Sequence, residues 1–365
     1  MRPPDPNDYK PSRRQRNVHI VTNPLRAFAR FCQRNIGWRK LGFVLSVAII
    51  VAAAMVLYRM LNGIDVDEVA DAIRATRWQS VALAAAFVAC GYFTLTFYDL
   101  YALRTIGRSD VPYRIAALGG FTSYSVGHNL GASVFTGSAV RYRIYSAQGL
   151  SAIDVAKVCF VAGLTFWLGN AAVLGLGIAY HPEAASAIDQ LPPELNRIIA
   201  AVVLAFLAGY VIWVWRGGRV VGKGAFQVTL PNGPLTLLQI AIGIVDLAFC
   251  ALAMYTLLPA EPAIDFVTLA VIFVSATLLG FASHSPGGIG VFDAAMLVAL
   301  AHFDREDLLA ALLLFRLLYY ITPFAMALLV LGVRELVVGI TGNRSWVPPR
   351  KVRATAPIRT EIDRK

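Results

Sequence analysis

The sequence predicts an all-α polytopic membrane protein. Three observations lead to this class: 57% of the 365 residues are hydrophobic, only 15% are charged, and the apolar residues gather in stretches long enough to cross a bilayer. The net charge of +11 comes largely from the two tails and from alternate loops, as membrane topology requires. A nucleic-acid-binding protein would instead gather its basic residues on one surface. We therefore exclude both a nucleic-acid binder and a soluble enzyme.

The two tails are basic and polar. Residues 1–24 and 343–365 carry too little apolar surface to pack, so we expect both to be disordered, with no cleavable signal peptide at the start. Residues 25–40 place Phe28 on an apolar helical stripe and Arg30 on a basic one. This pattern favours an interfacial amphipathic helix on the anionic cytoplasmic leaflet. A simple basic flank of the first span fits the same residues equally well.

Six stretches reach the roughly 20 apolar residues that a helix needs to span the hydrocarbon. They are residues 41–58, 80–101, 155–180, 197–215, 235–258 and 308–333. Two further apolar regions, 115–140 and 266–303, are harder to assign from length alone. The charges of the loops between them decide the topology.

Lys and Arg accumulate on the cytoplasmic side of bacterial membrane proteins, whereas acidic residues are weak topology signals. Basic clusters lie at 13–16, 39–40, 104–114, 141–157, 216–223 and 350–353. Segments without an excess of Lys and Arg lie at 65–71, 183–194, 261–265 and 304–307. The consistent solution has six crossings plus two re-entrant hairpins, the first entering from the cytoplasm and the second from outside. Both termini are then expected in the cytoplasm.

A short pattern, GFxSxSxG, occurs at 120–127 and again at 280–287, a shift of 160 residues. The same shift carries the first three spans onto the later ones to within several residues. Each copy then has three crossings and one hairpin, and an odd number of crossings inverts the second copy. We therefore predict membrane repeat 1 over 41–180 and an inverted repeat 2 over 181–335, a plan typical of alternating-access transporters.

Such transporters place broken helices near the midplane, where free backbone N–H groups can hold an anion. Glycines permit the sharp backbone that a break requires, and here they are Gly127, Gly131, Gly287, Gly288 and Gly290. Close packing of helices through small residues is the alternative role for each of them.

The sequences GHNLGAS at 127–133 and TGSAVRYRIY at 136–145 resemble the lysylphosphatidylglycerol synthetase transmembrane-region family, and so does SPGGIGVF at 285–292. The likeness covers residues 41–335. One departure is Asp293, where the family more often has Glu; the charge is kept and the side chain is one methylene shorter.

The resemblance implies a stand-alone, flippase-like domain that moves a phospholipid, such as aminoacylated phosphatidylglycerol, from the inner to the outer leaflet of the bacterial cytoplasmic (inner) membrane, in which the chain is expected to lie. Family members can join this membrane domain to a soluble lysyl-phosphatidylglycerol synthase domain. We expect no such domain after Lys365, and therefore no enzyme activity. A separate synthase is then an expected partner. Two alternatives stay open. One is a polyprenyl-phosphate or glycolipid carrier, and the other is a lipid-binding partner of an envelope enzyme that does not transport.

Ionisable residues inside membrane segments are costly and are therefore functional candidates. Lysyl-phosphatidylglycerol carries one phosphate and two ammonium groups, so its site needs cations and carboxylates. We expect Asp246 and Asp293 to meet the ammonium groups, or one of them to pair with Arg316. The residues expected at the phosphate are Arg141, Arg143, Gly127, Asn129, Gly287 and Gly288. Anchoring at the positive-inside face is the alternative for the two arginines.

The remaining candidates belong to the two hairpin motifs: Ser125, His128, Ser283, His284, Ser285, Pro286 and Gly290. A membrane histidine is more often a hydrogen-bonded residue than a proton carrier. Three neighbouring residues, 283–285, do not define the spatial triad of a hydrolase. The four cysteines have no CxxC spacing, so we expect no metal and no cofactor. The expected partners are membrane phospholipids, including anionic lipids at the cytoplasmic face.

Overall fold

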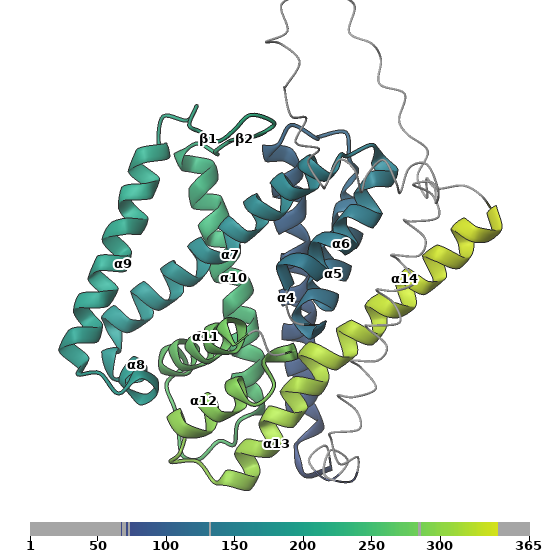
Figure 1. Cartoon of the computed structure of the whole chain (residues 1–365). Helices are drawn as coiled ribbons and strands as arrows, with labels where there is room; N and C mark the ends of the chain where they lie inside the picture. Colours follow the sequence, from purple (N-terminus) through teal and green to yellow (C-terminus); the bar gives the residue numbers. More distant parts are fainter. Residues whose placement is uncertain (1–66, 68–70, 72–73, 131–132, 284–285, 342–365) are drawn as a thin grey trace, which may run out of the picture. The chain divides into compact units, whose positions relative to one another are not determined.

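The computed structural model describes residues 67, 71, 74–130, 133–283 and 286–341. The first predicted span at 41–58, the predicted helix at 25–40 and both predicted tails lie outside these described residues. The described part is helical apart from loops and one short β-hairpin, which confirms the all-α class (Figure 1).

The helices of the first half are α4 (Trp78–Thr105), α5 (Tyr113–Leu130), α6 (Ser133–Tyr145), α7 (Ala152–Tyr180), α8 (Pro182–Asp189) and α9 (Pro193–Val214). A short 3₁₀ turn, η2 (Ser146–Gln148), follows α6. The second half contains β1 (Val220–Lys223), β2 (Phe226–Thr229), α10 (Gly233–Leu257), α11 (Phe266–Ala282), η3 (Pro286–Gly288), α12 (Val291–Ala299), α13 (Arg305–Arg316), the π-helical turn η4 (Leu317–Ile321) and α14 (Thr322–Thr341). The two strands pair antiparallel, with Val220 opposite Thr229.

Five helical stretches of the described part are long and apolar enough to cross a membrane: 78–105, 152–180, 193–214, 233–257 and 305–337. They coincide with the predicted spans at 80–101, 155–180, 197–215, 235–258 and 308–333. Five of the six predicted spans are therefore confirmed as helices of crossing length, and the protein is a multi-pass membrane protein.

Polar side chains fix where these helices begin. Ser151 and Asp154 form a capping box at the start of α7, in which each side chain bonds the other's backbone N–H. Asn232, Asp265 and Asp304 accept backbone N–H groups at the starts of α10, α11 and α13. The apolar runs alone would not define these boundaries.

The two regions that were hard to assign each fold as a pair of short helices. Helices α5 and α6 pack on one another, as do α11 and α12 (Figure 1). Their lengths of 18, 13, 17 and 9 residues fall below the roughly 20 residues of a full span. Both regions are thus helical hairpins.

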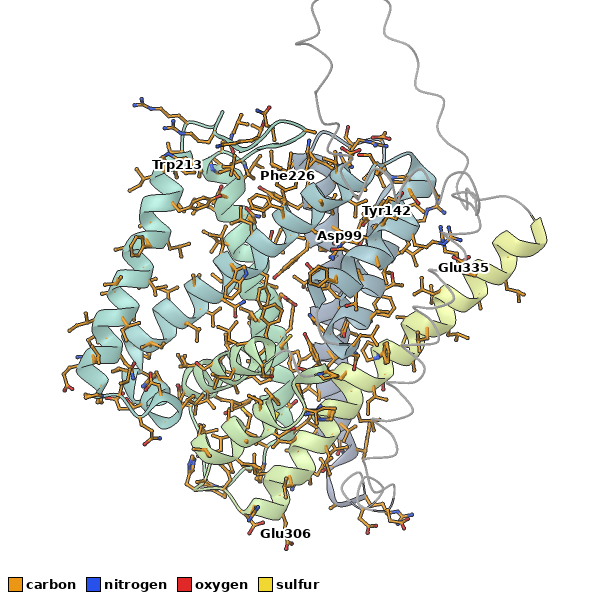
Figure 2. All side chains as sticks on the ribbon, in the orientation of Figure 1. Asp99, Tyr142, Trp213, Phe226, Glu306 and Glu335 are labelled. Atoms are coloured by element: carbon orange, nitrogen blue, oxygen red, sulfur yellow. The ribbon has the colours of Figure 1, made fainter. Side chains whose placement is uncertain are left out.

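The charges that predicted the topology separate in space. Arg108, between α4 and α5, donates to the carbonyls of Gln148 and Gly149, between α6 and α7. It also binds both oxygens of Asp110 and thereby lowers the pKa of that carboxyl. At the opposite end His181 lies 3.4 Å from Asp265. Figure 2 shows Trp213 and Phe226 at the first, basic end and Glu306 at the second, acidic end.

Small residues allow the central helices to approach closely. A Cβ on Gly243 of α10 would lie 2.7 Å from the Cα of Gly169 of α7, so the two backbones touch at this crossing. A Cβ on Gly120 of α5 would lie 3.2 Å from the Leu95 carbonyl oxygen of α4. These contacts bring α7 close to α10 and α5 close to α4.

Replacing Gly243 by valine should force α7 and α10 apart. We expect the free energy of unfolding in mixed micelles to fall by about 1–3 kcal/mol, the usual cost of overpacking. Gly163→Val is the matched control, because Gly163 also lies in a membrane helix and has no neighbouring atom within 4 Å of a Cβ. Equal stability of the two variants would contradict the contact.

Candidate functional site

Polar side chains gather in the middle of the apolar bundle, where α4, α5, α6, α10 and the π turn meet. We call this group the central polar cluster. Its members are Tyr92, Tyr98, Asp99, Tyr124, His128, Asn129, Arg141, Tyr145, Asp246 and Tyr319. Figure 2 shows Asp99 on its helix within the bundle rather than at either end.

A buried ion pair joins Arg141 of α6 to Asp99 of α4. The guanidinium binds the carboxylate in bidentate fashion, with Nη2 to Oδ1 at 2.7 Å and Nε to Oδ2 at 2.9 Å. The two side chains are 8% and 0% exposed. The Tyr145 hydroxyl donates to the same carboxylate at 2.5 Å. Such a charge is tolerated in an apolar interior only because it is paired and hydrogen-bonded.

The aromatic face of Tyr124 covers the Arg141 guanidinium, whose carbon lies 4.7 Å from the ring centre. Glycine makes room for this arrangement. The position of a Cβ on Gly119 is taken by the Tyr145 hydroxyl, and a Cβ on Gly137 would lie 3.2 Å from the Ser123 carbonyl oxygen. The first hairpin therefore brings Arg141 to Asp99 through close contact of α5 and α6.

Asp246 of α10 has no cation beside it. It is 4% exposed, its Oδ2 accepts a hydrogen bond of 3.1 Å from the Tyr98 hydroxyl, and its Oδ1 has no hydrogen-bond partner in the part of the chain that the structure describes. Within the described residues, no Lys, Arg or His forms an ion pair with it. Asp246 is thus an isolated carboxyl group in the centre of the bundle.

The π turn exposes backbone carbonyls that the first hairpin and α4 then bind. Tyr92 donates to the Tyr319 carbonyl at 3.0 Å, and Asn129 Nδ2 donates to the Tyr320 carbonyl at 3.1 Å. His128 packs between the rings of Tyr124 and Tyr319, and its buried Nδ1 has no hydrogen-bond partner. Asn129 was expected at a lipid phosphate; in the structure its amide holds the π turn.

The second hairpin is held by Arg316, the last residue of α13. Its Nη2 lies 2.6 Å from Asp293 Oδ2, and its Nη1 donates to the Gly287 carbonyl at 3.3 Å. Asp293 also accepts the Gly290 N–H at 3.0 Å and so caps α12. The charge pair considered for Arg316 is therefore formed, and its partner is Asp293 rather than Asp246.

The backbone at the tip of this hairpin is sharp, as predicted. Gly287, Gly288 and Gly290 have φ angles of 61°, 65° and 83°, which L-residues with a Cβ rarely adopt. Pro286 begins the short 3₁₀ turn of this tip. His284 and Ser285 lie outside the described residues.

The sharp backbone predicted at Gly127 is wrong. Gly127 is buried inside α5, which continues to Leu130, so its backbone is helical and not sharply bent. The hydroxyls of both repeat motifs also bond within their own helices, Ser125 to the Phe121 carbonyl and Ser283 to the Gly280 carbonyl. Gly131 lies outside the described residues.

Arg143 pairs with Glu335 of α14 at 2.6 Å, and Arg334 lies 3.3 Å from the same carboxylate. Two guanidinium groups thus share one carboxylate and leave an excess positive charge near the basic end. The positive-inside role considered for Arg143 and the phosphate-binding role both fit this placement.

Two apolar cavities lie between the helices of the described part, and the larger one reaches Tyr92 of the central polar cluster. The larger, about 810 Å³, is lined by α4, α5, the π turn and α14, with Thr96 and Arg114 among its polar residues. The smaller, about 310 Å³, is lined by α7, α10 and α11, for example by Gly177, Leu247 and Val271. Apolar pockets of a few hundred Å³ that adjoin convergent polar groups are typical of ligand sites.

Sequence reasoning missed Asp99, Tyr124 and Glu335. Asp99 lies within the predicted span 80–101, so the rule that singled out Asp246 as an ionisable residue in a membrane segment applies to it equally. Tyr124 and Glu335 carry no comparable signal, because their roles depend on which helices meet.

Comparison with known proteins identifies one family and several relatives of this chain. The sequence model of the family described as lysylphosphatidylglycerol synthase TM region matches residues 43–327. The uncharacterized protein slr0712 of Synechocystis sp. is 31% identical over 70% of this chain and 80% of its own length. The inner membrane protein YbhN of Escherichia coli is 28% identical over 80% of this chain and 92% of its own length.

A third relative is longer. Phosphatidylglycerol lysyltransferase of Staphylococcus aureus is 24% identical over 84% of this chain, but the match covers only 36% of the transferase. The similarity therefore concerns about a third of that protein.

Removing the carboxylate of Asp99 should leave the Arg141 charge buried and unpaired. We expect Asp99→Ala to lower the free energy of unfolding by about 3–5 kcal/mol, the range for a broken buried pair. Asp110→Ala removes a carboxylate from an exposed pair, and its cost should stay below about 1 kcal/mol.

The double variant Asp99→Leu, Arg141→Leu removes both charges and should recover most of the lost stability. Unfolding curves of the three variants in mixed micelles measure this. A single Asp99 variant as stable as the Asp110 variant would refute the importance of the pair.

Proposed function

The chain belongs to the lysylphosphatidylglycerol synthase TM region family, and on this basis we propose that it is a phospholipid translocase and not an enzyme. In this proposal it moves a phospholipid, with aminoacylated phosphatidylglycerol as the first candidate, from the inner to the outer leaflet. The buried Arg141–Asp99 pair beside the isolated Asp246 carboxyl carries the proposal. The names of two relatives, an inner membrane protein and a phosphatidylglycerol lysyltransferase, support the membrane and the lipid class.

The chemistry of lysyl-phosphatidylglycerol suits a buried ion pair. Its head group brings one phosphate and two ammonium groups, so it can exchange partners with Arg141 and Asp99 without leaving either charge unpaired. Asp246 can take the second ammonium group. Asp293 and Arg316 form an equivalent pair at the second hairpin. A neutral lipid would offer no such exchange.

The cavities fit the remainder of a phospholipid. The larger one is almost entirely apolar along α4, α5 and α14 and includes the cationic side chain of Arg114. In the proposed mode the acyl chains stay in this apolar space while the head group passes through the central polar cluster. The head group and the acyl chains take separate routes because moving a charged head group through hydrocarbon is costly.

Matched packing supports an inverted repeat. Hairpin α5–α6 packs on α14, from the other half of the chain, and α11 of the second hairpin packs correspondingly on α7. The larger cavity lies between α4, α5 and α14, and the smaller between α10, α11 and α7. Ser123 and Ser283, at equivalent motif positions, both bond the carbonyl three residues earlier. Rocking of one repeat against the other would then expose the cluster to each side in turn.

The proposed orientation puts the basic end in the cytoplasm. Arg108, Arg216 and Arg219 belong to loops of that end, and α14 reaches the same end through the contact of Arg143 with Glu335. Both termini would accordingly be cytoplasmic. Anionic lipids are expected partners of this face, and a separate synthase would supply the aminoacylated lipid.

Liposomes that contain the purified protein and labelled lysyl-phosphatidylglycerol test the proposal. Wild-type protein should accelerate the exposure of head groups on the opposite leaflet. Asp99→Asn, Arg141→Gln keeps the shapes of both side chains but removes the charges, and should slow exposure about tenfold or more, as loss of a charge-assisted contact implies.

Arg108→Gln is the matched control, because Arg108 binds Asp110 in an exposed loop. Equal rates for wild type, the double variant and empty liposomes would refute translocation of this lipid. Movement of a polyprenyl phosphate in the same assay, with no movement of phosphatidylglycerol derivatives, would select the alternative cargo.

A further inference from the structure

Asp246 differs from the other buried carboxylates of the described chain, because it faces no cation. The two buried arginines nearest the centre are engaged elsewhere, Arg141 with Asp99 and Arg316 with Asp293. Among the described residues, the only hydrogen bond to Asp246 comes from Tyr98, and none reaches Oδ1. An ionised carboxylate so isolated would be very costly in an apolar interior, so the group is neutral while this arrangement lasts.

The groups that face Asp246 are uncharged at neutral pH. Among the described residues they are Tyr98 of α4, which donates to it, Tyr124 of α5, which packs on Tyr98, and Cys250 of α10 itself; Tyr92 of α4 and Tyr319 of the π turn pack on one another next to these groups. These hydroxyl and thiol groups can shape the site but cannot neutralise a carboxylate.

The other elements of the described part that pack on α10 place no further unpaired charge beside Asp246. Helix α11 has no titratable residue. Arg316 of α13 is held by Asp293, and Tyr210 of α9 packs on Trp213. On α7, Asp154 and Lys157 belong to the first two turns, and Cys159 bonds Ser138. His128 of α5 packs between Tyr319 and Tyr124, the ring that covers Arg141, and within the described residues it forms no ion pair with a carboxylate.

We propose that Asp246 holds a proton in the lipid-free protein and exchanges it for an ammonium group of the lipid, which makes the protein a proton–lipid antiporter. This inference rests on the proposed function and names its coupling ion. The step breaks the carboxyl O–H bond, pairs the resulting carboxylate with the incoming R–NH₃⁺, and releases the proton to water. One positive charge enters the site and one leaves.

The exchange gives the transport a direction. A membrane with a more acidic exterior favours protonation of Asp246 when the site opens outward, and protonation expels the ammonium group. When the site opens inward, the lower proton concentration favours the lipid. Because proton and ammonium compete for one carboxylate, the site is occupied by one or the other, and the proton gradient drives the lipid outward.

Proton release on lipid binding tests the exchange directly. Purified protein in weakly buffered micelles with a pH-indicator dye is mixed with lysyl-phosphatidylglycerol, and bound lipid is counted in the same sample by native mass spectrometry. We expect up to one proton released per bound lipid. Phosphatidylglycerol, which has no ammonium group, should release none.

Asp246→Asn should abolish the release, whereas Glu306→Gln, which removes an exposed carboxylate at the acidic end, should leave it unchanged. Tyr98→Phe keeps the carboxyl group and should still release a proton. If Asp246→Asn does not fold, the infrared band of a protonated carboxyl in the wild type, and its loss on adding the lipid, provides the same test.

The outcomes separate the two proposals. Binding of lysyl-phosphatidylglycerol without proton release, or equal release by Asp246→Asn, overturns the exchange and leaves translocation intact. Absence of binding by the wild type overturns the exchange together with the choice of this lipid.

Discussion

The structure depends on one constraint: charges inside an apolar bundle must have partners. Arg141 binds Asp99 across 42 residues of sequence, Arg316 binds Asp293, and Arg143 binds Glu335 across 192 residues. Each pair ties a hairpin to another helix, so pairing decides where both hairpins lie. Hydrophobic packing alone has little power to do this, because lipid tails are as apolar as the helix surfaces they would replace.

The same constraint accounts for the departures from regular helix. At the π turn the freed carbonyls of Tyr319 and Tyr320 are taken by Tyr92 and Asn129, and at the second hairpin the Gly287 carbonyl is taken by Arg316. Arg316 directly precedes the π turn. The stretch from α13 to α14 therefore binds the first hairpin through Asn129 and the second through Arg316, and a shift of this stretch would act on both hairpins together.

Much of the fold could be predicted from sequence because the bilayer imposes simple rules. Span length located five helices, and two of the basic loops, 104–114 and 141–157, lie together at one end of the bundle. The Asp293–Arg316 pair was among the stated alternatives. The inverted repeat and the predicted crossing count stay predictions.

The rest was not accessible from one sequence. A glycine permits a break but does not require one, and Gly127 lies in a regular helix whereas Gly287 does not. The π turn has no residue pattern of its own in Leu317–Ile321, and the pairing of Arg143 with Glu335 depends on a helix meeting that local periodicity does not encode. Asp99 could have been found, because an ionisable residue within a span is itself the signal.

The partner exchange proposed for the Arg141–Asp99 pair would need relative motion of α4 and the first hairpin, since the two charges come from these two elements. The contact between them is suited to sliding. Gly120 presents a smooth backbone surface to Leu95 and Thr96, and Gly119 and Gly137 allow α6 to sit close behind. An interface of small residues resists translation less than interlocked large side chains do.

Tyr124 moves with Arg141, because both belong to the hairpin. The guanidinium of Arg141 therefore keeps its aromatic cover while its anionic partner changes from one group to another. The hairpin can thus carry a cation from one anionic partner to another without exposing it to hydrocarbon.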